Sequence, residues 1–148
     1  MGQLKSFLPM QHLFLDTCVL IYFLEGHAEF GPAAKKLLAK VERGDLKASI
    51  SSLTLTELLT GPYRANEDLL ALEYHVLFFH FPNLSLVDIN VDIAVEAARI
   101  RGAYNYSTPD SLLLSAALQV KAAAFITTDR KLCGFPELPV LHLTESTF

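Results

Sequence analysis

Cysteine is scarce in this sequence of 148 residues, and the two that occur, Cys18 and Cys133, lie far apart. They form neither a CxxC motif nor a zinc-type spacing, so we expect reduced packing residues. The five histidines also lack ligand spacing, which argues against a zinc enzyme. The phosphate-binding patterns GxGxxG and GxxxxGK followed by Ser or Thr do not occur, which argues against a nucleotide-dependent enzyme.

Long apolar runs are missing as well. The most continuous one, residues 18–24, is far shorter than the roughly 18 residues that cross a bilayer. The N-terminus has no secretory signal, so we expect a cytoplasmic protein without a membrane span. No repeat and no linker divides the chain, which predicts a single domain over residues 1–148 with residues 1–12 as an N-terminal leader.

What the sequence does have is a high apolar content. Hydrophobic residues make up 51% and charged residues 19%, which is typical of a folded domain. The net charge of −4 disfavours a freestanding nucleic-acid binder, unless the acidic residues cluster around a metal ion. The mean hydropathy of +0.33 is high for a small monomer, so we expect a homodimer, a partner protein, or both.

Short apolar segments alternate with helical segments along the chain. The strands are apolar on both faces, which is typical of a parallel sheet covered by helices on each side. The predicted fold class is therefore α/β, with three α/β/α layers and a central, mainly parallel sheet. The predicted strands are residues 12–15, 47–51, 84–87, 123–127 and 140–143, and the predicted helices are residues 17–24, 32–43, 52–59, 66–79, 91–101 and 108–120.

Four acidic residues follow predicted strands or begin the adjoining helices. Asp16 and Asp129 come after strands, and in a parallel sheet the carboxyl ends of the strands form the ligand-binding edge. Asp110 begins the helix that leads to the strand before Asp129, and Glu57 lies on an apolar helix just after another strand. Carboxylates gathered at one edge repel each other unless a cation neutralises them. Oxygen ligands favour Mg²⁺ or Mn²⁺.

Each acid alone also has a simpler interpretation. Asp16 could be a helix N-cap, and Asp129 could cap the turn that follows it. Asp110 could complement a helix dipole, and Glu57 could be a solvated helix charge. The joint arrangement of all four at strand ends and helix starts favours a metal site over coincidence.

The same residues occur in motifs that resemble the PIN-domain family, especially the toxin ribonucleases of VapBC toxin–antitoxin pairs. The resemblance extends from about Leu13 to Leu143, nearly the whole chain. Each motif is weak alone, but four in this order are fairly specific. The motifs are Phe14–Ile21 (FLDTCVLI), Thr56–Gly61 (TELLTG), Pro109–Leu113 (PDSLL) and Ile126–Asp129 (ITTD).

This resemblance implies a PIN-like sheet of about five strands and metal-dependent hydrolysis of RNA phosphodiester bonds, typically in tRNA or rRNA. It implies that Asp16, Asp110 and Asp129 are Mg²⁺ or Mn²⁺ ligands, with Glu57 completing the catalytic site directly or through water. Thr127 resembles a hydroxyl residue that supports the last acid. The family also implies a homodimer and, for the toxins, a cognate antitoxin. The basic residues near the motifs, which could contact RNA phosphates, are Arg64, Arg101, Arg130 and Lys131.

Two other protein classes that use an acidic residue at a strand end fit this sequence less well. A haloacid-dehalogenase-like phosphatase needs a second Asp two positions after the first, where this chain has Cys18. A receiver-type signalling domain needs a mid-chain Asp paired with a later Lys, and no convincing pair occurs. Two alternatives stay open: a non-catalytic PIN-like module that binds RNA or protein, and a standalone PIN nuclease in RNA processing.

Overall fold

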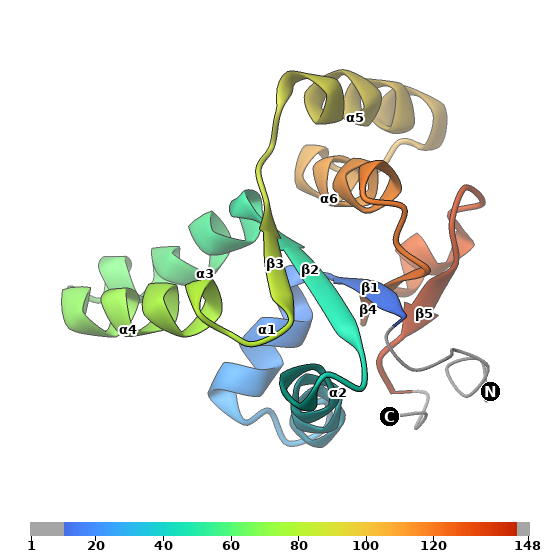
Figure 1. Cartoon of the computed structure of the whole chain (residues 1–148). Helices are drawn as coiled ribbons and strands as arrows, with labels where there is room; N and C mark the ends of the chain where they lie inside the picture. The colour runs from blue at the N-terminus through green and yellow to red at the C-terminus, as the bar shows by residue number, and fades with distance from the viewer. Residues whose placement is uncertain (1–10, 145–148) are drawn as a thin grey trace.

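Five parallel strands form one sheet in the computed structural model, which describes residues 11–144 (Figure 1). Their order across the sheet is β3-β2-β1-β4-β5, and the predicted fold class is confirmed. Of the predicted leader, residues 1–10 lie outside the described residues and His12 already begins β1. The strands are β1 (His12–Leu15), β2 (Lys47–Ser51), β3 (Leu84–Val87), β4 (Ala124–Thr127) and β5 (Val140–His142).

Helices cover both faces of this sheet (Figure 1). One face packs against α1 and α2, the other against α5 and α6, while α3 and α4 pair beside α1 and β3. Within residues 11–144, none of the helices is both long and apolar enough to cross a membrane. The helices are α1 (Thr17–Glu25), α2 (Gly31–Arg43), α3 (Ser52–Arg64), α4 (Asp68–Phe79), α5 (Val91–Tyr104), α6 (Thr108–Gln119) and the 3-10 helix η2 (Arg130–Gly134).

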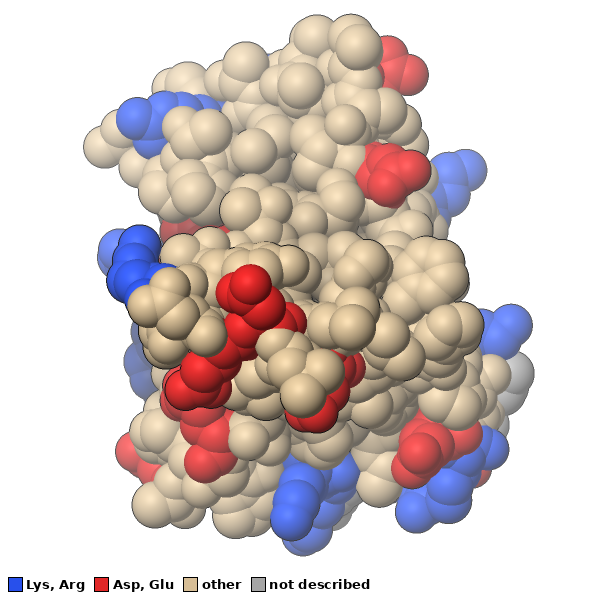
Figure 2. Space-filling view, turned by 90° about the vertical axis from the view of Figure 1, so that its left-hand side faces the viewer, with Lys and Arg blue, Asp and Glu red and all other residues tan. Residues whose placement is uncertain are grey.

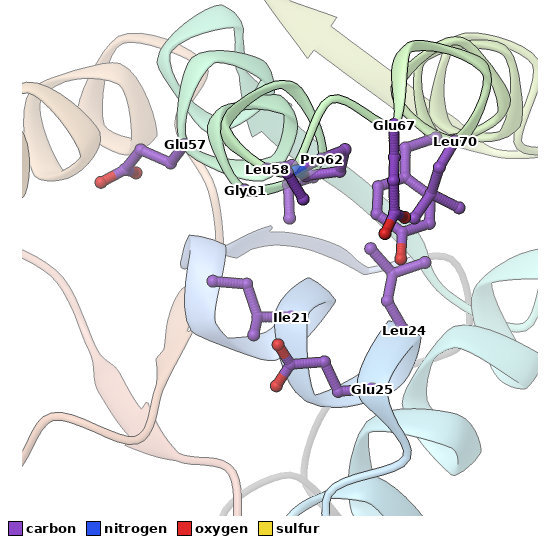
Figure 3. Close-up of a pocket in the computed structure, with 11 residues that line it drawn as sticks. Ile21, Leu24, Glu25, Glu57, Leu58, Gly61, Pro62, Glu67 and Leu70 are labelled. Carbon is purple, nitrogen blue, oxygen red and sulfur yellow. The ribbon is translucent and has the colours of Figure 1, made fainter.

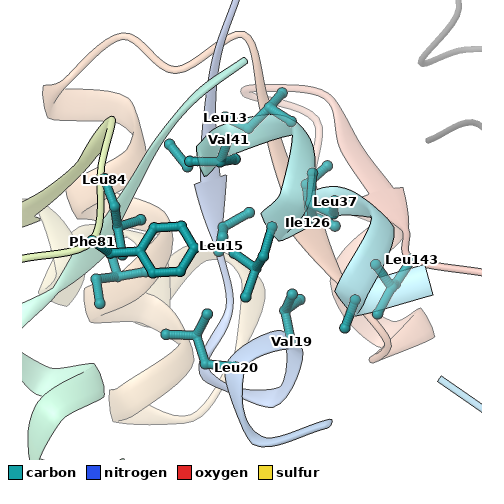
Figure 4. Packing of buried hydrophobic residues seen from close by; sticks show 14 of the residues in the cluster. Leu13, Leu15, Val19, Leu20, Leu37, Val41, Phe81, Leu84, Ile126 and Leu143 are labelled. Carbon is teal, nitrogen blue, oxygen red and sulfur yellow. The ribbon is translucent and has the colours of Figure 1, made fainter. Parts of the chain in front are cut away.

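The central strands are buried on both faces, which explains their lack of polar alternation. Leu13 and Leu15 point into the core that α1 and α2 cover, which Figure 4 shows from close by. Phe14, between them, points the other way and stacks on Phe125 of β4 with ring centres 5.8 Å apart. These four side chains have no exposed surface, so every position of β1 after His12 contributes apolar burial to folding.

Two helices extend beyond their predicted ends. The prediction that α3 stops before Gly61 and Pro62 is wrong, because the helix continues to Arg64 with Pro62 inside it. Proline lacks an amide hydrogen, but in the last turn this removes a single hydrogen bond. Likewise, α5 passes Gly102 and ends at Tyr104, and the left-handed φ of 60° at the following Asn105 provides the stop.

The strand order changes direction at the carboxyl end of β1. From β1 the chain passes to β2 on one side, and it returns as β4 on the other side. Neighbouring connections that leave in opposite directions open a binding site at such a point. The backbone amide of Asp16 donates to the carbonyl of Ile126 (2.9 Å), which joins the ends of β1 and β4 at this point.

Candidate metal centre

Asp16 lies at the N-cap position of α1, but its side chain makes no capping hydrogen bond. Its Oδ2 atom instead accepts a 2.7 Å hydrogen bond from the hydroxyl of Thr127 at the end of β4. The carboxyl group is buried, with 8% of the residue exposed. A buried carboxylate that does not cap its helix needs another explanation for its position, and the simple N-cap interpretation therefore does not account for it.

Asp16 interacts electrostatically with two of the other three acids, Asp110 and Glu57. Its pKa is raised to about 6, with burial as the largest cause. The negative charges of Asp110 and Glu57 act in the same direction, while the hydrogen bonds from the Thr127 hydroxyl and the backbone of Thr17 act in the opposite direction. The fold therefore holds Asp16 in a place where ionisation is unfavourable without a compensating positive charge.

The side chain of Glu57 is hydrogen-bonded to Thr17, the residue that follows Asp16. Its Oε1 atom accepts a 2.6 Å hydrogen bond from the hydroxyl of Thr17, which also lies 3.0 Å from the hydroxyl of buried Thr54. Two turns of different helices, α1 and α3, are joined in this way. Sequence reasoning missed Thr17 and Thr54, although a hydroxyl residue directly after Asp16 was a possible signal.

Asp110 and Asp129 are positioned by local hydrogen bonds. The hydroxyl of Ser107 caps α6 by accepting from the backbone amide of Asp110 (3.2 Å). The amide of Asp129 donates to the hydroxyl of Thr127 (3.0 Å), so Thr127 connects Asp16 with Asp129. The carboxylate of Asp129 also accepts from the amide of Lys131 (3.0 Å), which shows that the capping interpretation of Asp129 is correct as well.

A comparison with protein-family models shows the family of the chain. The family model described as PIN domain matches residues 13–138. The chain belongs to the PIN domain family. No curated protein sequence matches this PIN domain.

Solved structures with the same fold include toxin–antitoxin proteins. VapBC2 from Rickettsia felis, bound to a DNA fragment from its promoter, is 20% identical with a TM-score of 0.69, covering 89% of this chain and 98% of that one. A toxin–antitoxin complex from Klebsiella pneumoniae is 21% identical with a TM-score of 0.69, covering 88% and 97%. VapC20 of Mycobacterium tuberculosis, a Sarcin-Ricin loop cleaving toxin, is 17% identical with a TM-score of 0.66, covering 86% and 98%.

The four acids of this PIN domain surround one region without touching one another. Within residues 11–144, no three Asp, Glu, His or Cys side chains are close enough together to hold one metal ion. Two of the acids make hydrogen bonds of their own, since Glu57 accepts from the hydroxyl of Thr17 and Asp129 from the amide of Lys131. The donors are all carboxylate oxygens, which fit Mg²⁺ or Mn²⁺, and buried Asp16 has an unfavourable charge that such an ion would offset.

The predicted RNA-contacting cations of the PIN domain are all exposed, and none forms an ion pair within residues 11–144. Arg130 and Lys131 directly follow Asp129, and Arg101 donates to the backbone carbonyl of Tyr106. Arg64 lies in the last turn of α3, two helical turns or about 10 Å beyond Glu57. The structure thus keeps three cations near the acids and sets Arg64 apart.

Cys18 is next to the acidic region but is not a reactive thiol. Burial, followed by the charge of Asp16, raises its pKa to about 11, and the hydroxyl of Thr128 donates to its sulfur at 3.3 Å. A neutral thiol is a poor nucleophile. Cys18 and Cys133 are not joined in a disulfide, as expected from the sequence.

Proposed function

We propose that this PIN domain is a Mg²⁺- or Mn²⁺-dependent endoribonuclease and the toxin of a VapBC toxin–antitoxin pair. The observation that carries the proposal is the buried carboxyl group of Asp16, which makes no helix cap and whose pKa is raised by burial, Asp110 and Glu57. Such an arrangement lowers the stability of the metal-free fold, and carboxyl groups with pKa values raised in this way are typical of functional sites. The toxin assignment is supported by the similarity in fold to VapBC proteins.

In the proposed mechanism, Asp16, Asp110 and Asp129 would hold the ion, and Glu57 would complete the site directly or through water. When bound, a divalent cation activates water for attack on phosphorus and offsets the charge of the phosphate. The Thr127 hydroxyl keeps Asp16 in place by donating to Oδ2 and fixes the backbone of Asp129. Thr17 does the same for Glu57. No nucleophilic side chain is required.

Replacing Asp110 by Asn tests this function. We expect the purified protein to cleave members of a panel of tRNA, rRNA and total RNA with Mg²⁺ or Mn²⁺ and not with EDTA. Asp110→Asn should lower the cleavage rate by about a hundredfold or more, because it removes a charged metal ligand. Asp92→Asn is the matched control, since Asp92 lies in the first turn of neighbouring α5 and is exposed.

The outcomes separate the alternatives. Cleavage that persists in EDTA, or that is equal in Asp110→Asn and Asp92→Asn, contradicts the proposal. If folded wild-type protein binds RNA but cuts none of the panel, the non-catalytic PIN-like module becomes the better account. If it cuts RNA but has no partner protein, a standalone nuclease is favoured over a toxin.

A pocket beside the acids supports an antitoxin as partner. It has a volume of about 340 Å³ and lies between α1, α3 and α4. Figure 3 shows Ile21 and Leu24 of α1 facing Leu70 of α4 across it, with Glu25 and Glu67 at opposite sides. Its lining includes Glu57 but no Lys or Arg. We infer that the antitoxin inserts a segment with apolar anchors and basic side chains here.

The charge of the surrounding surface agrees with a basic partner. In the face that Figure 2 shows, on the side of the α3–α4 pair, acidic side chains gather near the middle and basic ones lie mostly toward the edges. This surface would repel RNA phosphates but attract a cationic protein segment. Occupation of the pocket would place that segment next to Glu57, so binding and inhibition would be coupled.

Charge reversal tests this partner site. We expect the wild-type protein to bind the small protein encoded beside its gene, and Glu25→Lys/Glu67→Lys to weaken that binding by about tenfold or more. The matched control is Glu29→Lys/Glu42→Lys, which changes two exposed acids outside the pocket. Calorimetry with the purified partner gives both affinities, and equal weakening by the two double variants would contradict the site.

The predicted homodimer is part of the proposal too. Light scattering on the free protein tests it directly, and a monomer at all concentrations would contradict it.

A further inference from the structure

An aromatic cluster joins the two segments that carry Asp110 and Asp129. Tyr106 comes just before the start of α6, and Phe135 directly follows η2, which begins next to Asp129. The Tyr106 ring stacks on that of Tyr104 with centres 5.9 Å apart and contacts the Phe135 ring edge-on at 6.1 Å. Segments about thirty residues apart therefore meet through aromatic rings beside the candidate metal centre.

Hydrogen bonds hold the Tyr104 side chain of this cluster. The hydroxyl of Tyr104 donates to Glu137 at 2.6 Å, and Arg99 donates to both Glu137 and Glu96. Exposed ion pairs of this kind contribute little to stability. The hydrogen bond to Glu137 orients the Tyr104 ring on which Tyr106 stacks.

Tyr106 itself stays partly exposed and lies near the acids. Burial, followed by the negative charge of Asp129, raises the pKa of its hydroxyl, which indicates that the two side chains are close. Arg101 donates to the backbone carbonyl of Tyr106, which holds its guanidinium at the same segment of the chain. An exposed aromatic ring with an adjacent cation is a common way to bind a base and its phosphate in single-stranded RNA.

We propose that Tyr106 stacks on an unpaired base next to the phosphate that is cut, while Arg101 contacts a phosphate of the same strand. This inference rests on the proposed ribonuclease function and names the form of RNA that the site accepts. It also explains how a chain with a net charge of −4 can bind RNA. Stacking does not depend on charge, so a tyrosine can supply affinity that an acidic surface cannot.

Three variants test the role of Tyr106. Tyr106→Ala should raise KM for an unpaired RNA substrate by about tenfold to a hundredfold, with a much smaller change in kcat. Tyr106→Phe keeps the ring and should restore KM. The matched control is Tyr63→Ala, which removes an exposed tyrosine from α3 and should have no effect. Mn²⁺ affinity and thermal denaturation, measured for all three, show whether the fold and metal centre are intact.

A second measurement does not depend on cleavage. Single-stranded oligoadenylate containing 2-aminopurine is mixed with the protein in Ca²⁺, and stacking on Tyr106 should quench its fluorescence. We expect quenching by the wild type, Tyr106→Phe and Tyr63→Ala, and loss of quenching with Tyr106→Ala. Equal quenching by Tyr106→Ala and the wild type, or no quenching by the wild type, overturns the inference.

The two proposals can fail separately. If the wild type quenches the fluorescence through Tyr106 but cuts no RNA, the ribonuclease function fails and the base-stacking site stands. If the wild type cuts RNA and Tyr106→Ala has the same KM, the function stands and the stacking site fails. An abasic nucleotide beside the cut should lower the rate for the wild type but have little further effect in Tyr106→Ala.

Discussion

Asp16→Asn is expected to reduce RNA cleavage by about a thousandfold, because a bound metal contributes several kcal/mol to the reaction and each 1.36 kcal/mol is tenfold in rate. Asn can still accept the hydrogen bond from Thr127, so the fold should be kept. What it loses is the negative charge that a cation needs. Cleavage of the RNA panel, with Asp92→Asn as control, measures this effect.

The same substitution should stabilise the metal-free protein. The pKa of Asp16 rises from 3.8 to about 6 in the fold, so the folded state binds the proton more tightly than the unfolded state. The wild type therefore loses stability as the pH rises from 3.8 to about 6 and stays less stable above that range. The loss corresponds to about 2–3 kcal/mol in the free energy of unfolding, and Asp16→Asn removes it.

Urea denaturation in EDTA provides the measurement. The variant and the wild type should have similar stability near the lower end of that pH window and should differ most above its upper end. A variant that is less stable than the wild type at high pH would contradict the account, because it would mean that the ionised carboxylate stabilises the fold. Lost activity together with gained stability would identify Asp16 as a functional acid.

Thr127→Val is expected to weaken Mn²⁺ binding by about tenfold to a hundredfold, although Thr127 need not touch the metal. Its hydroxyl donates to Asp16 and accepts from the amide of Asp129, and it is completely buried. Valine has nearly the same shape but leaves both partners without a hydrogen bond, which costs about 1–3 kcal/mol of stability. Calorimetric titration with Mn²⁺ and thermal denaturation measure the two effects.

Thr127→Ser separates the hydroxyl from the methyl group. Serine should recover most of the Mn²⁺ affinity, because it can make the same two hydrogen bonds. Thr60→Val, a change at an exposed threonine of α3, controls for general effects of the substitution. If Thr127→Val and Thr127→Ser bind Mn²⁺ equally well, the hydroxyl does not position the acids.

The fold could be predicted because its signals are local. The strands of this sheet are short apolar segments, and Ser107 and Pro109 mark the start of α6. The boundary errors occurred at Pro62 and Gly102, where the residue type suggests a stop but the helix continues. Pro62 lies in the last turn, where it removes a single hydrogen bond, and the left-handed Asn105 rather than Gly102 provides the stop of α5.

The candidate site was only partly predictable. Strand-end positions pointed to Asp16 and Asp129, because the ends of parallel strands meet at one edge. The hydrogen bond between Thr17 and Glu57 crosses 40 residues, and no local pattern encodes it. The contact of Tyr106 with Phe135 depends likewise on how α6 and η2 pack, so sequence reasoning named basic residues for RNA but not this aromatic cluster.

The proposed metal centre requires Asp16, Asp110 and Asp129 to converge on one divalent cation. Titration with Mn²⁺, followed by electron paramagnetic resonance, tests it without RNA or a partner. We predict saturable binding by the wild type and Asp92→Asn, and loss of that binding in Asp16→Asn and Asp110→Asn. Absence of saturable binding by folded wild-type protein, or equal binding by all four proteins, would contradict the claim.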